Sequence, residues 1–194
     1  MVNIGVTGHR YLKETGKIIK GVDKALKMIE GTFGSPPIMI SALAEGADRL
    51  VVFRAQSMWE DTQLIALLPT KLDDYLEEFT SLVSKAEINN LIETADQVIK
   101  LNEEGSLTAA YLEAGRQILE RCDVLVAIWD GQESQGEGGT AEIVALARVR
   151  GLPLAWIHAG NRQPETITPT TLGKEQGLVT YERFGLAANR KLKP

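Results

Sequence analysis

Six short apolar runs limit the folds open to this chain more than any other feature of its sequence. Most of them lack the polar alternation of a sheet with one face in water, so they indicate strands buried on both faces. The runs are Val2 to Thr7, Ile38 to Ala42, Gln63 to Leu68, Gln97 to Leu101, Asp123 to Trp129 and Leu152 to His158. Strands of this kind predict a parallel sheet that is covered by helices.

Amphipathic stretches separate these runs, with apolar residues at spacings of three and four. They are Glu14 to Thr32, Gly46 to Trp59, Leu72 to Glu93, Ser106 to Arg121 and Thr140 to Arg150. The third stretch is long, and it is either one helix or a helix broken near Lys85 or Asn89. The alternation of strand and helix predicts an α/β fold with a three-layer, doubly wound, mainly parallel sheet of the Rossmann-like type.

Length and composition predict one soluble domain with a core of its own. The chain has 194 residues, of which 44% are hydrophobic and 24% charged, and a chain of this size needs no metal or disulfide to stabilise it. We expect a Rossmann-like domain over residues 1–160 and a C-terminal extension over residues 161–194 that packs on the same domain. The extension is rich in Gly, Pro and Thr, with one short strand near Leu178 to Tyr181.

The termini, the single cysteine and the net charge limit where this protein acts and what it binds. The amino terminus lacks the features of a signal peptide and no run is long enough to cross a membrane, so we expect a cytoplasmic protein without a membrane partner. The single cysteine, Cys122, precedes a strand and is interpreted as a packing residue. The net charge of −5 disfavours duplex nucleic acid. We predict no metal site.

The end of the first strand carries the first candidate site, Thr7-Gly8-His9-Arg10. Ligands of doubly wound sheets bind outside the carboxyl ends of the strands. A glycine there lets the backbone approach a ligand, Thr7 offers a hydroxyl group, and Arg10 offers a cation suited to phosphate. The alternative is a tight turn with a surface arginine.

The second candidate lies between the second strand and its helix, with Ser41, Ala44, Glu45, Gly46 and Asp48 as site residues. Amides at the start of a helix bind anions readily. The alternative, a helix cap with a packing glycine, is about equally favoured by the residues.

The third candidate follows the fifth strand and opens the next helix. Glycines beside a threonine at a helix amino terminus leave several N–H groups free to bind a phosphate. Glu142, in the first turn, is predicted to accept hydrogen bonds from ribose or, alternatively, only to interact with the helix dipole. The other site residues here are Asp130, Gly131, Gly138, Gly139 and Thr140.

Together these segments resemble the SLOG superfamily, which groups the LOG phosphoribohydrolases, the Smf/DprA proteins and nucleotide-sensing domains. The segment Ser41 to Asp48 is similar to the Smf/DprA pattern Ser-Gly-x-Ala-x-Gly-Ile/Val-Asp, and Gly139-Thr140 is similar to the centre of the LOG motif Pro-Gly-Gly-x-Gly-Thr-x-x-Glu. Aligned on that pair, Ile143 takes the place of the catalytic glutamate of the LOG enzymes, and Glu142 comes one residue earlier. The resemblance covers about residues 1–159.

The resemblance implies a nucleotide or NAD-derived ligand and a homodimer or higher homo-oligomer. Our first hypothesis is a binding or sensing module in which amides hold phosphate, Arg10 supplies counter-charge and Asp130 or Glu142 contacts the ribose. The alternative is hydrolysis of the N-glycosidic bond of a nucleoside monophosphate, with Glu142 as the catalytic residue and Arg10 or Arg116 holding the phosphate. A module for single-stranded DNA is a third possibility, disfavoured by the acidic balance.

Overall fold

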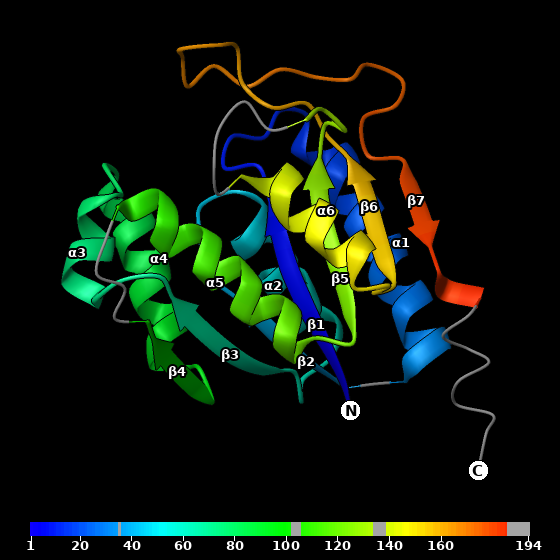
Figure 1. Cartoon of the computed structure of the whole chain (residues 1–194), viewed down its shortest axis with the longest axis horizontal. Helices are drawn as coiled ribbons and strands as arrows, with labels where there is room; N and C mark the ends of the chain where they lie inside the picture. The colour runs from blue at the N-terminus through cyan, green and yellow to red at the C-terminus, as the bar shows by residue number, and fades with distance from the viewer. Residues whose placement is uncertain (35, 102–105, 134–138, 186–194) are drawn as a thin grey trace.

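A computed structural model describes residues 1–34, 36–101, 106–133 and 139–185 (Figure 1). Its strands are β1 (Val2–Gly8), β2 (Pro37–Ser41), β3 (Gln63–Leu68), β4 (Gln97–Lys100), β5 (Val124–Trp129), β6 (Leu154–His158) and β7 (Val179–Glu182). Its helices are α1 (Thr15–Phe33), α2 (Ala47–Met58), α3 (Leu72–Glu77), α4 (Leu82–Glu93), α5 (Leu107–Arg121) and α6 (Thr140–Val149).

The strands form one sheet in the order β4-β3-β2-β1-β5-β6-β7. All neighbours pair in parallel except β6 and β7, which are antiparallel, with Ile157 opposite Val179. The order runs outward in one direction from β1 to β4 and in the other direction from β5 to β7. It therefore reverses between β1 and β5, which are direct neighbours, with Gly8 opposite Ile128.

Two helical layers cover the sheet. Helices α1 and α2 contact each other and pack on β6, β7, β1 and β2, while α5 and α6 contact each other and pack on β1, β2, β3 and β5. The predicted three-layer α/β fold with a mainly parallel sheet is confirmed.

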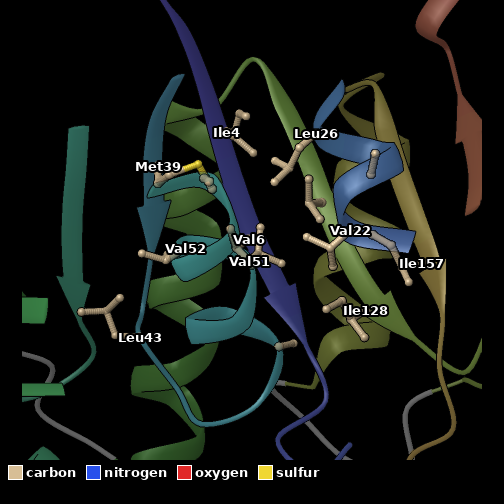
Figure 2. Packing of buried hydrophobic residues seen from close by; sticks show 14 of the residues in the cluster. Ile4, Val6, Val22, Leu26, Met39, Leu43, Val51, Val52, Ile128 and Ile157 are labelled. Atoms are coloured by element: carbon tan, nitrogen blue, oxygen red, sulfur yellow. The ribbon is translucent and has the colours of Figure 1, made fainter. Parts of the chain in front are cut away.

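The larger part of the core lies between the sheet and the layer of α1 and α2 (Figure 2). Val22 and Leu26, one helical turn apart on α1, face Ile4 of β1 and Ile157 of β6, and all four side chains are buried. The spacing of apolar residues along α1 thus places one continuous stripe on the sheet.

The long stretch predicted as one helix, or as a helix broken near Lys85 or Asn89, is two helices with the break at residues 78–81. The hydroxyl of Ser81 accepts a hydrogen bond from the amide of Ser84 and so caps the start of α4. Phe79, between the two helices, is buried against Tyr75. The break therefore falls earlier than predicted, because a capping serine and a buried aromatic side chain fix it.

No helix among the described ranges is long and apolar enough to span a membrane. After β6 the chain first forms a loop that crosses the carboxyl ends of the strands, drawn in orange in Figure 1, and then β7 at the edge of the sheet.

Candidate functional site

A pocket of about 600 Å³ opens where the strand order reverses between β1 and β5. Crevices at such positions are the usual ligand sites of doubly wound sheets, and ligand pockets commonly measure roughly 300–1,000 Å³. Predicted site residues that line it are Thr7, Gly8, His9, Arg10, Ala44, Asp48, Asp130, Gly139 and Thr140.

The loop after β1 is held in place by backbone contacts on both sides. The amide of His9 donates to the carbonyl of Ile128 at 3.0 Å, and the carbonyl of His9 accepts from the amide of Ala47 at 3.1 Å. A Cβ atom on Gly8 would lie 2.4 Å from the Cβ of Ala47, so only glycine fits there. The loop after β1 is therefore locked between β5 and α2.

Gly46, which precedes α2, lets the turn after β2 pack closely against the loop after β1. Its φ of 76° is one that L side chains rarely adopt, and a Cβ there would lie 2.3 Å from the carbonyl oxygen of Arg10. Gly46 does not itself line the pocket. Its role in this structure is to let the two loops touch backbone to backbone.

The turn after β2 is organised around the buried carboxylate of Asp48. The hydroxyl of Ser41 donates to this carboxylate at 2.9 Å, and the amides of Ala42 and Ala44 also donate to it. Burial raises the pKa of Asp48 to about 6, and the hydrogen bonds from Ser41, Ala44 and Ala42 oppose this rise. The side chain lines the pocket as an acidic group, not as a phosphate ligand.

The remaining polar groups of the same turn are also engaged. The amide of Leu43, which has a φ of 59°, donates to the hydroxyl of Ser41 at 3.0 Å. The carbonyl of Leu43 accepts from Arg49, and the carbonyl of Ala42 accepts from the hydroxyl of Tyr75. Because the amides of residues 42–44 already have acceptors, this turn shapes the wall of the pocket and leaves anion binding to other groups.

Arg10 is the cation of the pocket on the side of β1. Its guanidinium contacts a carboxylate oxygen of Glu45 at 3.3 Å and lies 5.7 Å from the centre of the Phe79 ring. Burial acts to lower the pKa of Arg10, but Tyr111 and Glu45 outweigh it and raise that pKa, so the group stays charged. Glu45 lies outside the pocket lining and acts through this ion pair.

His9 and Asp130 meet at the centre of the switch point. The amide of Asp130 donates to Nε2 of His9 at 3.0 Å, and a carboxylate oxygen of Asp130 lies 3.3 Å from the same nitrogen. Burial acts to raise the pKa of Asp130, but its contacts with His9 and with the amide of Gln132 outweigh burial and lower that pKa. Asp130 is therefore ionised at neutral pH.

Gly131 turns the chain at this point. It has a φ of 79°, and a Cβ there would lie 2.9 Å from the Trp156 ring. Gly131 is not among the residues that line the pocket.

The amino end of α6 faces the pocket through Gly139, Thr140 and Ala141. The amides of Glu142 and Ile143 donate to the carbonyl of Gly139, whereas Thr140 and Ala141 come too early in the helix to have an acceptor within it. Their amides are therefore available to an acceptor from outside the helix. The predicted site residue Gly138 lies outside the described residues.

Several predicted residues lie away from the pocket surface. Glu142 and Ser41 are not among the residues that line the pocket, and Arg116 is exposed on α5 without lining it. In the described ranges no group of three His, Cys, Asp or Glu side chains is arranged to bind a metal.

Sequence reasoning missed two walls of the pocket. Helix α5 contributes Tyr111, Gly115 and Ile118, and the loop after β6 contributes Asn161, Arg162 and Pro164. The position of the loop after β6, at the carboxyl end of a strand beside the switch point, was a usable signal. No sequence signal marked the contribution of α5, because it depends on how closely α5 and α6 pack. The two helices are so close that a Cβ on Gly115 would lie 2.2 Å from Ile143.

The chain is thus an α/β protein of the Rossmann-like class with its pocket at the topological switch point. Comparison with solved structures finds TM1055, a structural genomics target determined by X-ray crystallography, with a TM-score of 0.49 and 16% sequence identity. The match covers 79% of this chain and 72% of that chain. No protein-family model matches the chain, and a search of curated proteins found no significant match.

Proposed function

We propose that this chain binds a nucleotide or a nucleotide derivative in the pocket between β1 and β5, as a sensing or binding domain of the SLOG type. The observation that carries the proposal is the meeting, in one pocket, of the loop after β1, the loop after β5 and the amino end of α6. The loop after β1 lies far from the other two segments in the sequence, and it was a separate candidate from the segment that joins β5 to α6.

The amino end of α6 suits the phosphate of such a ligand. The amides of Thr140 and Ala141 and the helix dipole stabilise an anion together. Arg10 lines the same pocket and carries a positive charge. These groups replace the turn after β2, whose amides are engaged with Asp48 and Ser41.

The rest of the pocket suits a sugar and a base. The ionised carboxylate of Asp130 is an acceptor for ribose hydroxyl groups. The rings of Tyr11 and Tyr111, both in the pocket lining, offer surfaces on which a base stacks. The pocket therefore has groups for each part of a nucleotide.

Isothermal titration calorimetry with AMP, GMP and NAD tests the proposal. We expect at least one of them to bind the wild-type protein, and we expect Gly139→Val to abolish this binding because the valine side chain fills the mouth beside the amides of α6. Gly31→Val is the matched control, since nothing lies within 4 Å of a Cβ at Gly31. Absence of binding by all three ligands, or equal binding by both variants, contradicts the proposal.

The same samples separate binding from hydrolysis. The carboxylate assigned to catalysis, Glu142, does not line the pocket, so we expect AMP and GMP to be recovered intact. Release of free base, detected by chromatography, contradicts a purely binding role and favours N-glycosidic hydrolysis.

A further inference from the structure

The loop after β6, residues 159–178, brings a second arginine to the pocket. Arg162 is part of the pocket lining. Within the described part of the chain, no carboxylate forms an ion pair with its guanidinium, whereas Arg10 is paired with Glu45. An arginine that lines a pocket without an internal counter-charge is suited to bind an anion from outside.

The carboxylates of the pocket do not neutralise this arginine. Those among the described lining residues are Asp48, Asp130 and Glu133. The carboxylate of Asp48 is occupied by the donors of the turn after β2, and that of Asp130 is in contact with His9. The positive charge of Arg162 therefore remains available to a ligand.

The position of Arg162 is set by an aromatic ring and by its own loop. Its guanidinium lies 5.7 Å from the centre of the Tyr11 ring, within the range of a cation–π contact. Its backbone forms an antiparallel bridge with Pro169. A Cβ on Gly160 would lie 2.7 Å from the backbone of Thr170, so the two arms of the loop pack directly on each other. The loop thus presents Arg162 as a fixed part of the pocket wall.

Gln176 ties this loop to the rest of the domain. Its side chain is 4% exposed, and its oxygen accepts hydrogen bonds from the amides of Gly160 and Leu172, both at 3.0 Å. Its Nε2 donates to the carbonyl of Lys13 at 2.7 Å. One buried side chain therefore joins both ends of the loop to the segment between β1 and α1, and so positions Arg162.

The two arginines of the pocket come from different sides of the sheet's switch point. The guanidinium of Arg10 lies beside Glu45 and Phe79, on the side of β2, whereas Arg162 comes from the end of β6. Strands β1 and β5 lie between β2 and β6 in the sheet. A phosphate at Arg10 and the start of α6 therefore leaves Arg162 free for a second anionic group.

We propose that Arg162 binds a second phosphate of the ligand, and that the pocket therefore selects nucleotides with a diphosphate over nucleoside monophosphates. The proposal rests on the proposed nucleotide site and narrows its ligands to nucleoside diphosphates and dinucleotides. A planar guanidinium donates to two phosphate oxygens at once. Arg162 is the specificity-determining residue, and Gln176 is the residue that positions it.

Calorimetry with the pairs ADP and AMP, and GDP and GMP, tests this selection for either purine base. We expect the wild type to bind the diphosphate at least about tenfold more tightly than the monophosphate, which corresponds to one charge-assisted contact. Arg162→Gln should remove this preference by weakening the diphosphate, and it should change the affinity for the monophosphate by less than about twofold.

Arg183 supplies the matched control, since it is exposed after β7 and does not line the pocket. Arg183→Gln should bind both members of each pair as the wild type does. Equal affinity of the wild type for diphosphate and monophosphate overturns the proposal. So does Arg162→Gln if it leaves the affinity for the diphosphate unchanged or weakens both ligands equally.

Gln176→Leu tests the positioning role separately. We expect it to reduce the preference for the diphosphate while the affinity for the monophosphate stays within about twofold, because the start of α6 lies outside the contacts of Gln176. A general loss of structure would weaken both ligands equally and lower the melting temperature. That result, or a preference equal to that of the wild type, would show that Gln176 does not position Arg162.

Failure of this proposal is distinct from failure of the proposed function. If AMP or GMP binds the wild type as tightly as its diphosphate, the selection by Arg162 is wrong and the nucleotide site stands. If all four nucleotides and NAD fail to bind, the proposed function fails and the selection fails with it.

Discussion

Two glycine-containing segments at the same edge of the sheet, the turn at residues 41–46 and the start of α6 at residues 139–141, use their backbone amides in opposite ways. In the turn, the amides of Ala42, Leu43 and Ala44 are bound by the side chains of Ser41 and Asp48. At the start of α6, the amides of Thr140 and Ala141 have no acceptor within the helix and face the pocket. The first segment supports the pocket, and the second is available to a ligand.

The comparison shows that a glycine beside a helix start does not by itself mark an anion site. Whether such a segment binds an anion depends on whether a carboxylate of the chain already occupies its amides. Asp48 fills the position that a phosphate would take in the turn after β2, because its buried carboxylate accepts from the hydroxyl and the amides there.

The largest expected effect concerns the backbone contact that seats the turn. Gly46→Ala should lower the free energy of unfolding by about 4 kcal/mol, because alanine strains the backbone at a φ of 76° and its Cβ meets the carbonyl of Arg10. Urea denaturation measures the change. Gly31→Ala, with nothing within 4 Å of its Cβ, is the control and should not destabilise. A loss below about 1 kcal/mol for Gly46→Ala would show that the loops do not depend on this contact.

The next effect is a pH dependence that comes from Asp48. The pKa of its buried carboxyl is about 6 in the fold against 3.8 for the free group, so the folded protein binds the extra proton and is stabilised at low pH. Stability from this group is fully present below pH 3.8 and is lost as pH rises through about 6, by roughly 3 kcal/mol at 1.36 kcal/mol per pH unit.

The control for this prediction is Asp48→Asn, which has no proton to lose. The difference in unfolding free energy between wild type and variant should change by about 2 kcal/mol between pH 4 and pH 7, because the unfolded carboxyl is already more than half ionised at pH 4. A constant difference across that range would mean that Asp48 is not buried as a charge in the fold.

A smaller effect is expected at Ser41, whose hydroxyl links the amide of Leu43 to Asp48. Ser41→Ala leaves the buried amide of Leu43 without its acceptor and removes one of the donors to Asp48, and we expect a loss of about 2 kcal/mol in thermal or chemical denaturation. Ser57, whose hydroxyl donates to a carbonyl at the exposed surface of α2, is the matched control, and Ser57→Ala should change stability by less than about 0.5 kcal/mol. Equal losses at both serines would refute a special role for Ser41.

The smallest expected effect lies at the start of α6. Ala141→Glu places a carboxylate beside the free amides and should stabilise the fold by about 0.5 kcal/mol through the helix dipole. The same carboxylate occupies the position proposed for phosphate, so binding of AMP measured by calorimetry should weaken. If Ala141→Glu stabilises the fold and AMP binding stays unchanged, the amides at the start of α6 do not contact the ligand.

The sheet was predictable because its strands are nearly continuous apolar runs. The run at β5, Val124–Trp129, is buried along its whole length, and such a segment has few alternatives to the centre of a parallel sheet. The break at residues 78–81 was misplaced although Ser81 is a local capping signal, because the break also depends on the burial of Phe79 against Tyr75, which the local sequence does not reveal.

The candidate site was predictable only as a set of strand ends. Each polar or glycine-rich segment after β1, β2 and β5 was found because strand ends carry the ligand groups in this class of fold. What each group does was not predictable, since Asp48 satisfies the turn after β2 from seven residues beyond Ser41. The wall formed by Tyr111 was missed because it depends on how α5 packs, whereas the wall formed by Arg162 was missed although it follows the end of β6.

The most direct test of the account is an NMR titration that follows backbone amide signals as AMP, GMP or NAD is added. We predict that the largest shifts fall on Gly8, His9, Asp130, Thr140 and Ala141, while the amides of Leu43 and Ala44 move little because side chains already hold them. Shifts confined to another surface, or strong shifts in the turn at residues 41–46 with none at the start of α6, would contradict the assignment of the pocket.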